Sequence, residues 1–288
     1  MGVALGDVDA DLSGLRRFER AAGARARLVG IYQAFGLDQF DAELLSRLRA
    51  HGAVPMVTWE PWDWRKGLSQ PDFALARIAG GAFDDYARAW AAAAHAWGRV
   101  LYLRFAPEMN GDWRPWSERV NGNRPGDFVA AWRHLHAVFA AAGARNVRWV
   151  WSPNAIYEGA IPLARLYPGR QTVDLVGIDG FNWGTTQSWS SWQSFESVFG
   201  PTLRSVRRLT HKPVLLTEVA SADRGGDKAR WLRGFFRGLA RHREIRGFVW
   251  FNEDKEADWR IDSSNAARRT FAWGVSARKF RVPPGFRP

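Results

Sequence analysis

Residues 104–116 combine the side chains that sugar chemistry requires. They follow the apolar run 100–103, which predicts a buried strand with Glu108 placed just beyond it. A carboxylic acid in that position can protonate a glycosidic oxygen. The amide and acid beside it can bond sugar hydroxyls, and the indoles can stack on a pyranose ring. The candidate binding residues of this segment are Asn110, Asp112, Trp113 and Trp116.

A second carboxylate, Glu218, follows the apolar run 214–217. A retaining glycosidase needs two carboxyl groups roughly 5–5.5 Å apart, one as acid/base and one as nucleophile. In a closed barrel of eight strands, the fourth and seventh strands face each other, so Glu108 and Glu218 can meet across its mouth. Taken alone, Glu218 is equally consistent with a structural carboxylate that caps a following helix.

The whole chain alternates short β-rich runs with longer segments of helical period, which predicts a (β/α)8 barrel formed by a single domain over residues 1–288. The expected strands are 3–6, 28–32, 54–59, 100–105, 147–151, 173–178, 214–217 and 247–250. Helices are expected near 12–22, 41–50, 83–97, 128–142, 195–209, 228–241 and 266–273, with an irregular stretch after the fifth strand. The alternative is an open doubly wound sheet, which usually carries a glycine-rich turn after its first strand. Residues 6–9 do not supply that turn.

Barrel enzymes place their catalytic groups at the C-terminal ends of the strands. Arg104 is expected to point into the barrel with Glu108, where its guanidinium would stabilise the charge of Glu218. The chain holds 17 tryptophans, many of them beside predicted strand ends, which favours a cleft lined with indoles. Core packing is the alternative for Trp59 and Trp250. The further binding candidates at these ends are Glu60, Trp62, Arg104, Asp179, Asn182, Trp183 and Trp250.

The composition of the chain limits which metals, cofactors and macromolecules it is expected to bind. The absence of cysteine excludes disulfides and thiolate metal sites, and no credible pair of histidine ligands is visible, so we expect neither metal nor cofactor. The net charge of +12 comes from arginines scattered through predicted helices, which favours a solvated surface over nucleic-acid binding. A third interpretation is that the positive charge attracts an anionic polysaccharide.

No apolar run reaches the roughly 18 residues of a membrane span, so no membrane partner is expected. No signal-peptide pattern begins the sequence, which leaves a mature secreted or cell-envelope domain as the expectation and a cytoplasmic protein as the alternative. We expect a monomer.

The segment 104–113 resembles the acid/base motif of glycoside hydrolase family 26, and segments 54–62 and 176–183 resemble other strand ends of that group. The family contains β-mannanases, mixed-linkage β-glucanases and β-xylanases, all retaining enzymes built on (β/α)8 barrels. The resemblance implies that Glu108 is the acid/base and Glu218 the nucleophile.

Two positions depart from the family pattern. Many members have a histidine, which binds the sugar next to the cleaved bond in mannanases, where this chain has Pro107. Many also have a tyrosine near the nucleophile where this chain has Phe181, and Tyr32 or Trp183 is expected to replace the missing phenol.

We therefore expect a retaining endo-β-glycanase that cleaves a β-linked polysaccharide, whether β-glucan, mannan, xylan or a bacterial exopolysaccharide. The alternative is a carbohydrate-binding pseudoenzyme on the same barrel.

Overall fold

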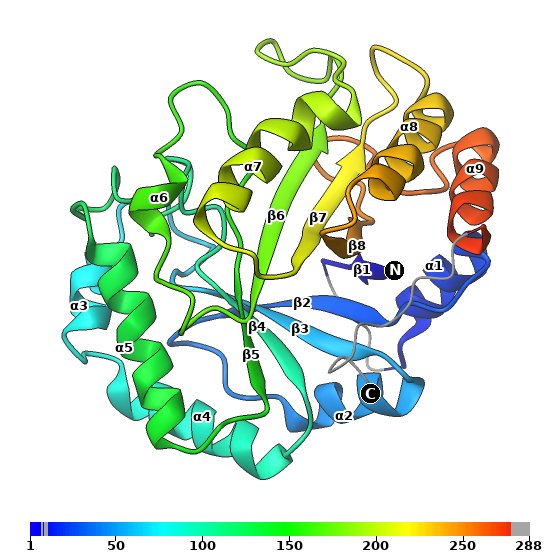
Figure 1. Cartoon of the computed structure of the whole chain (residues 1–288). Helices are drawn as coiled ribbons and strands as arrows, with labels where there is room; N and C mark the ends of the chain where they lie inside the picture. Colours follow the sequence, from blue (N-terminus) through cyan, green and yellow to red (C-terminus); the bar gives the residue numbers. More distant parts are fainter. Residues whose placement is uncertain (7, 9–10, 278–288) are drawn as a thin grey trace.

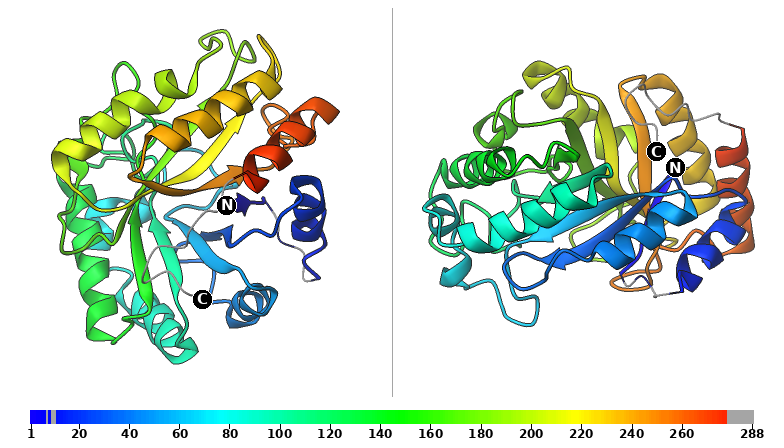
Figure 2. Two further views of the ribbon diagram at one scale, coloured as in Figure 1. Left: turned by 45° about the vertical axis from the view of Figure 1, so that its right-hand side comes forward. Right: turned by 90° about the horizontal axis from the view of Figure 1, so that it is seen from below.

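The protein folds into a closed barrel of eight parallel strands, as seen in a computed structural model that describes residues 1–6, 8 and 11–277 (Figure 1). The strands pair in the order of the chain, and the last strand pairs with the first. Helices surround the barrel (Figure 2). The predicted (β/α)8 fold is confirmed.

The elements lie close to the expected positions. The strands are β1 (Gly2–Ala4), β2 (Leu28–Ala34), β3 (Val54–Glu60), β4 (Leu101–Phe105), β5 (Val147–Trp151), β6 (Leu175–Asn182), β7 (Val214–Ser221) and β8 (Ile245–Phe251). The longer helices are α1 (Ser13–Ala22), α2 (Ala42–His51), α4 (Asp84–Trp97), α5 (Asp127–Ala141), α7 (Phe195–Leu209), α8 (Lys228–Arg241) and α9 (Asn265–Ser276). In the described part of the chain, no helix is both long and apolar enough to cross a membrane.

Three short helices were not expected, because each is too short to show a helical period. The loop after β3 contains the 3-10 helix η1 (Pro71–Phe73) and α3 (Leu75–Ala79), and the stretch after β5 contains α6 (Leu163–Leu166).

The strands β6 and β7 each extend four residues beyond their predicted ends. Their register moves from Ile178 opposite Leu216 to Asp179 opposite Glu218, which leaves Thr217 as an extra residue in β7. Such a bulge interrupts the alternation of side chains between the two faces of a strand. Thr217 and Glu218 therefore both direct their side chains into the barrel, where each contacts buried polar groups.

The side chains inside the barrel change from apolar to polar along the barrel axis. Inward side chains near the N-terminal ends of the strands are apolar and form one buried cluster, made of Ala4, Leu28, Val54, Met56, Tyr102, Val150, Leu175, Leu215 and Val249. Towards the C-terminal ends they become polar but remain buried, as in Thr58, Arg104, Ser152, Asp179 and Thr217. The buried polar layer forms the floor of the barrel mouth, where a (β/α)8 enzyme carries its active site.

Gly177 of β6 makes room for this polar layer. A Cβ atom at this position would lie 2.5 Å from Ser152 Oγ and 2.6 Å from Thr217 Oγ1. These two hydroxyls also bond each other at 2.6 Å. Any larger residue must displace one of them.

We predict that Gly177→Ala lowers the free energy of unfolding by about 1–3 kcal/mol, because the added methyl group overpacks a closed interior. The matched control is Gly234→Ala in α8, where, apart from the chain neighbours and the backbone of the same helix, no atom of the described residues lies within 4 Å of the added Cβ. That change should raise stability by about 0.5–1 kcal/mol, since alanine is favoured over glycine inside a helix. Chemical denaturation of the three proteins gives both values, and a Gly177→Ala protein as stable as wild type would contradict the close packing.

Candidate active site

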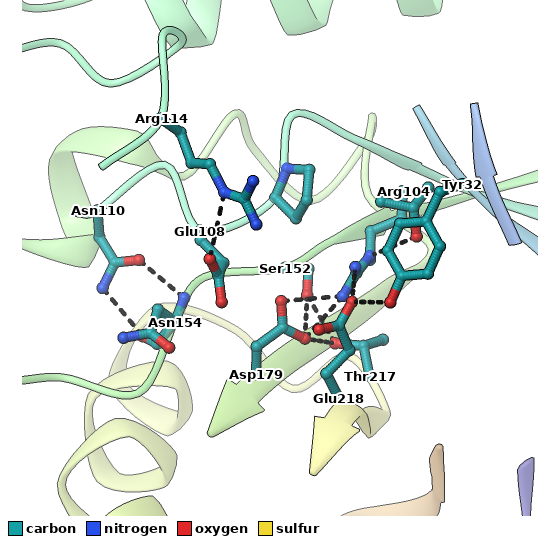
Figure 3. A network of polar contacts seen from close by, with 12 residues as sticks. Tyr32, Arg104, Glu108, Asn110, Arg114, Ser152, Asn154, Asp179, Thr217 and Glu218 are labelled. Carbon is teal, nitrogen blue, oxygen red and sulfur yellow. Dashed lines mark hydrogen bonds and ion pairs between the residues drawn. The ribbon is translucent and has the colours of Figure 1, made fainter. Parts of the chain in front are cut away.

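Glu218 of β7 is held by two donors from other strands. Arg104 Nη2 of β4 donates to its Oε1, and the Tyr32 hydroxyl of β2 donates to the same oxygen at 2.8 Å (Figure 3). Each bond is charge-assisted, which roughly doubles its strength relative to a bond between neutral groups. The carboxylate is thereby fixed and its negative charge is balanced.

Arg104 is fully buried and connects three strands. Its Nη1 donates to Asp179 Oδ1 and Oδ2 at 2.8 and 2.9 Å, and its Nε donates to Thr58 Oγ1 at 3.1 Å. Burial disfavours the charged guanidinium, but the charges of Asp179 and Glu218 outweigh it and raise the pKa of Arg104. Arg104 is therefore a permanent cation beneath Glu218, as expected from its spacing, and its buried guanidinium is bonded to protein groups.

Asp179 completes the floor of the site. Besides Arg104, it accepts bonds from Thr217 Oγ1 at 2.7 Å and from Ser152 Oγ at 3.3 Å. Asp179 is fully buried, and its carboxylate bonds other buried side chains of the barrel. The expectation that it contacts substrate is therefore wrong.

Tyr32 supplies the phenol that the sequence lacks at position 181. Burial is the main cause that raises the pKa of Tyr32 well above its usual value, and the nearby charge of Glu218 adds to it. The hydroxyl therefore keeps its proton and remains a donor. Phe181 instead packs against Phe251 and Trp259, with ring centroids 5.7 and 5.2 Å away.

Glu108 lies in a tight turn after β4. Both Ala106 and Glu108 have positive φ, 47° and 58°, which is a costly conformation for residues with a side chain. The Glu108 N–H donates to the Ser152 carbonyl at 2.8 Å, which ties the turn to the end of β5. Figure 3 shows the Glu108 carboxyl group directed into the space that Glu218 also faces.

Two side chains of the following loop contact the Glu108 carboxyl group. Trp113 Nε1 donates to Oε2 at 2.8 Å, and Arg114 Nε lies 3.6 Å from the same oxygen. The two carboxylates of the site therefore have different surroundings, which is the condition for giving them different catalytic roles.

Asn110 and Trp116 shape the loop and are fully buried, so the expectation that they contact sugar is wrong. Asn110 exchanges two bonds with the backbone of Asn154, at 2.9 and 2.8 Å. The Trp116 indole donates to the Pro107 carbonyl at 2.5 Å. Both hold the turn that presents Glu108.

Two further candidates are corrected for the same reason. Trp250 is fully buried and donates to the Trp259 carbonyl at 2.9 Å, so neither face of its indole is open for stacking. Asn182 is also fully buried, and its amide donates to Ser221 Oγ at 2.9 Å. Trp59, for which core packing was the alternative, is buried as well.

The remaining candidates lie at least partly open to solvent, and they are Glu60, Trp62, Asp112, Trp113 and Trp183. Trp62 Nε1 donates to Glu60 Oε2 at 3.1 Å, and burial raises the pKa of Glu60.

Exposed aromatic rings lie in the loops after β4, β5 and β6. Trp113 is 38% exposed and packs beside Tyr157, with centroids 5.4 Å apart. Trp183 packs beside Trp189, which is 70% exposed, with centroids 5.3 Å apart. These two aromatic pairs come from loops after β4, β5 and β6, and they offer apolar surface of the kind that stacks on sugar rings.

Sequence reasoning did not assign roles to Thr217, Ser152 or Arg114. Thr217 lies next to Glu218, so strand alternation alone would place the two side chains on opposite faces. Arg114 lies in an irregular loop whose path no periodicity indicates.

Sequence comparisons find similarity to a family of glycosyl hydrolases. Residues 92–212 match the family model described as Glycosyl hydrolase family 26. Endoglucanase H of Acetivibrio thermocellus is 39% identical over 235 residues, which cover 79% of this chain and 25% of the relative. The chain thus spans about a quarter of the length of that relative.

Solved structures share the fold. The catalytic domain of the Bacillus sp. JAMB-750 endo-β-1,4-mannanase is 17% identical with a TM-score of 0.68, over 90% of this chain and 78% of that one. A double mutant of the Cellulomonas fimi endo-β-1,4-mannanase is 19% identical with a TM-score of 0.69, over 91% of this chain and 66% of that one. Fold, site and sequence together lead to one assignment: the chain belongs to glycosyl hydrolase family 26.

Proposed function

We propose that the protein is a retaining endo-β-glycanase in which Glu108 is the acid/base and Glu218 the nucleophile. The observation that carries the proposal is the different environment of the two carboxyl groups. Glu218 is bonded to a buried cation and a phenol, which suit a group that must attack as a carboxylate. Glu108 faces the same space from a turn at the barrel mouth, as a group that exchanges protons with substrate must.

The reaction then proceeds in two displacements. Glu218 attacks the anomeric carbon while the glycosidic C–O bond breaks and Glu108 gives its proton to the leaving oxygen. This step leaves the sugar joined to Glu218 as an ester. Water then attacks the anomeric carbon, Glu108 takes a proton from that water, and the ester bond breaks to restore the Glu218 carboxylate.

We propose a β-glucan as the substrate. The relative with 39% identity is named an endoglucanase, whereas the mannanase structures are only 17–19% identical. Pro107 supports the choice, because it stands where the sugar-binding histidine of mannanases is expected and has no side-chain donor. The exposed indoles suit a polymer that lies across the barrel mouth.

We predict that the protein releases reducing ends from mixed-linkage β-1,3-1,4-glucan faster than from β-mannan or xylan. Glu108→Gln and Glu218→Gln should each lower the rate on the best substrate by at least about 100-fold, because a general acid alone typically contributes 10²–10⁴-fold. Glu158→Gln, which changes an exposed acid in the loop after β5, is the matched control and should retain full activity.

A reducing-sugar assay over this polysaccharide panel measures each rate. Near wild-type turnover by either catalytic variant would refute the assigned roles. Glycan binding by the wild-type protein without release of any reducing end would instead indicate a binding protein.

The bond from Tyr32 to Glu218 gives a further prediction. Tyr32→Phe should lower kcat/KM about 10- to 100-fold, since a hydrogen bond to a charged group contributes about 1.5–3 kcal/mol. Tyr167→Phe is the control, because the buried Tyr167 hydroxyl has no hydrogen-bond partner within the part of the chain that the structure describes, and its ring packs against Trp151. Steady-state kinetics on the best substrate compares the two, and equal activity of both variants would show that the Tyr32 bond is not used.

A further inference from the structure

Arg114 is held beside the proposed acid/base by two indole rings. Its guanidinium carbon lies 5.3 Å from the centre of the Trp62 ring and 5.6 Å from that of Trp116. The two rings themselves meet edge to face at 5.7 Å. This packing fixes the position of the guanidinium, because arginine stacks favourably on aromatic faces.

The fixed cation faces one oxygen of Glu108. Arg114 Nε lies 3.6 Å from Glu108 Oε2, and Trp113 Nε1 donates to that same atom at 2.8 Å. Arg114 Nε is buried and, among the residues that the structure describes, has no hydrogen-bond partner, so its contact with Oε2 is an ion pair. A cation and an indole N–H therefore both face Oε2, and Oε1 remains for the substrate.

Arg114 stays charged in this place. Burial disfavours its charged form, but the charges of Glu60 and Glu108 outweigh burial and raise the pKa of Arg114. A carboxyl oxygen that faces a cation and an indole N–H is a poor place for a proton, since a protonated oxygen would itself be a donor. The proton of Glu108 belongs on Oε1.

We infer that Arg114 is a positioning residue for the proposed acid/base. With Trp113 it orients the carboxyl group so that Oε1 presents the proton to the glycosidic oxygen. Its charge also balances the negative charge that develops on Glu108 as that proton leaves. This inference rests on the proposed role of Glu108, and it assigns to Arg114 a function that stacking between two indoles does not require.

The test uses the dependence of the rate on the leaving group. The probes are phenyl and 2,4-dinitrophenyl β-cellotriosides, which present a short chain of the proposed β-glucan substrate. A phenoxide leaving group needs the proton from Glu108, whereas dinitrophenoxide departs without it. Arg114→Met should therefore lower kcat/KM about tenfold on the phenyl glycoside, a part of the 10²–10⁴-fold that a general acid supplies. On the dinitrophenyl glycoside the change should stay below about twofold.

Two further variants sharpen the comparison. Arg114→Lys keeps the charge and should recover part of the loss on the phenyl glycoside. Arg124→Met changes an exposed arginine of the same loop and should leave both rates unchanged. Thermal melting of each variant reports whether the loop has kept its fold.

Each outcome decides between the two proposals. An equal loss on both glycosides, or no loss on either, would overturn the role of Arg114. Glu108→Ala should show a larger split between the two glycosides than Arg114→Met does. If it shows none, the proposed role of Glu108 fails, and the role of Arg114 fails with it.

Discussion

The buried ion pairs of Arg104 are the interaction on which the rest of the site depends. One guanidinium binds Asp179 on β6, Glu218 on β7 and Thr58 on β3. Removing the charge from water is costly, and the cost is offset only when every donor finds an acceptor. Loss of one partner would leave an unpaired charge in the barrel, at a typical cost of about 3–5 kcal/mol. The network therefore sets the positions of β6 and β7 and of the carboxylate between them.

The local irregularities of the barrel serve this network. Gly177 leaves space for the hydroxyls of Ser152 and Thr217, which both bond Asp179. The bulge in β7 brings Thr217 and Glu218 to the same face. On the opposite side of the mouth, the left-handed turn at Glu108 is held by backbone bonds to the neighbouring strand end. The Glu218 carboxyl group is thus fixed by the buried cation Arg104, whereas the Glu108 carboxyl group is held by the turn and loop to which it belongs.

The eight strand–helix units and the placement of Glu108 after the fourth strand could be predicted from hydrophobic period and composition, because strands and longer helices have strong local signals. Phe181 lacks a hydroxyl, so Tyr32 or Trp183 was expected to replace the missing phenol, and the structure shows that Tyr32 bonds Glu218. The bulge in β7 could not be predicted, since an apolar run followed by Thr217 and Glu218 has the pattern of an ordinary strand end. Its consequence is that β7 continues to Ser221.

The sequence also could not predict which aromatic and amide side chains are buried. Trp116 and Trp250 carry the same indole as Trp113, and only the path of the chain decides which of them is enclosed. Asn110 likewise looked like a sugar ligand, but its amide is matched by a backbone segment 44 residues away. The position of Arg114 could not be predicted, because it depends on contact with Trp62, a residue of another loop.

The central claim is that Glu218 attacks the anomeric carbon from the buried cationic network. Its most direct test is to incubate the protein with 2-deoxy-2-fluoro-β-cellotriosyl fluoride, digest it with pepsin and locate the added sugar by mass spectrometry. We expect one sugar per chain, attached to the peptide that contains Glu218. A label on Glu108 or on another carboxylate, or turnover of natural substrate with inversion at the anomeric carbon and no labelled peptide, would contradict it.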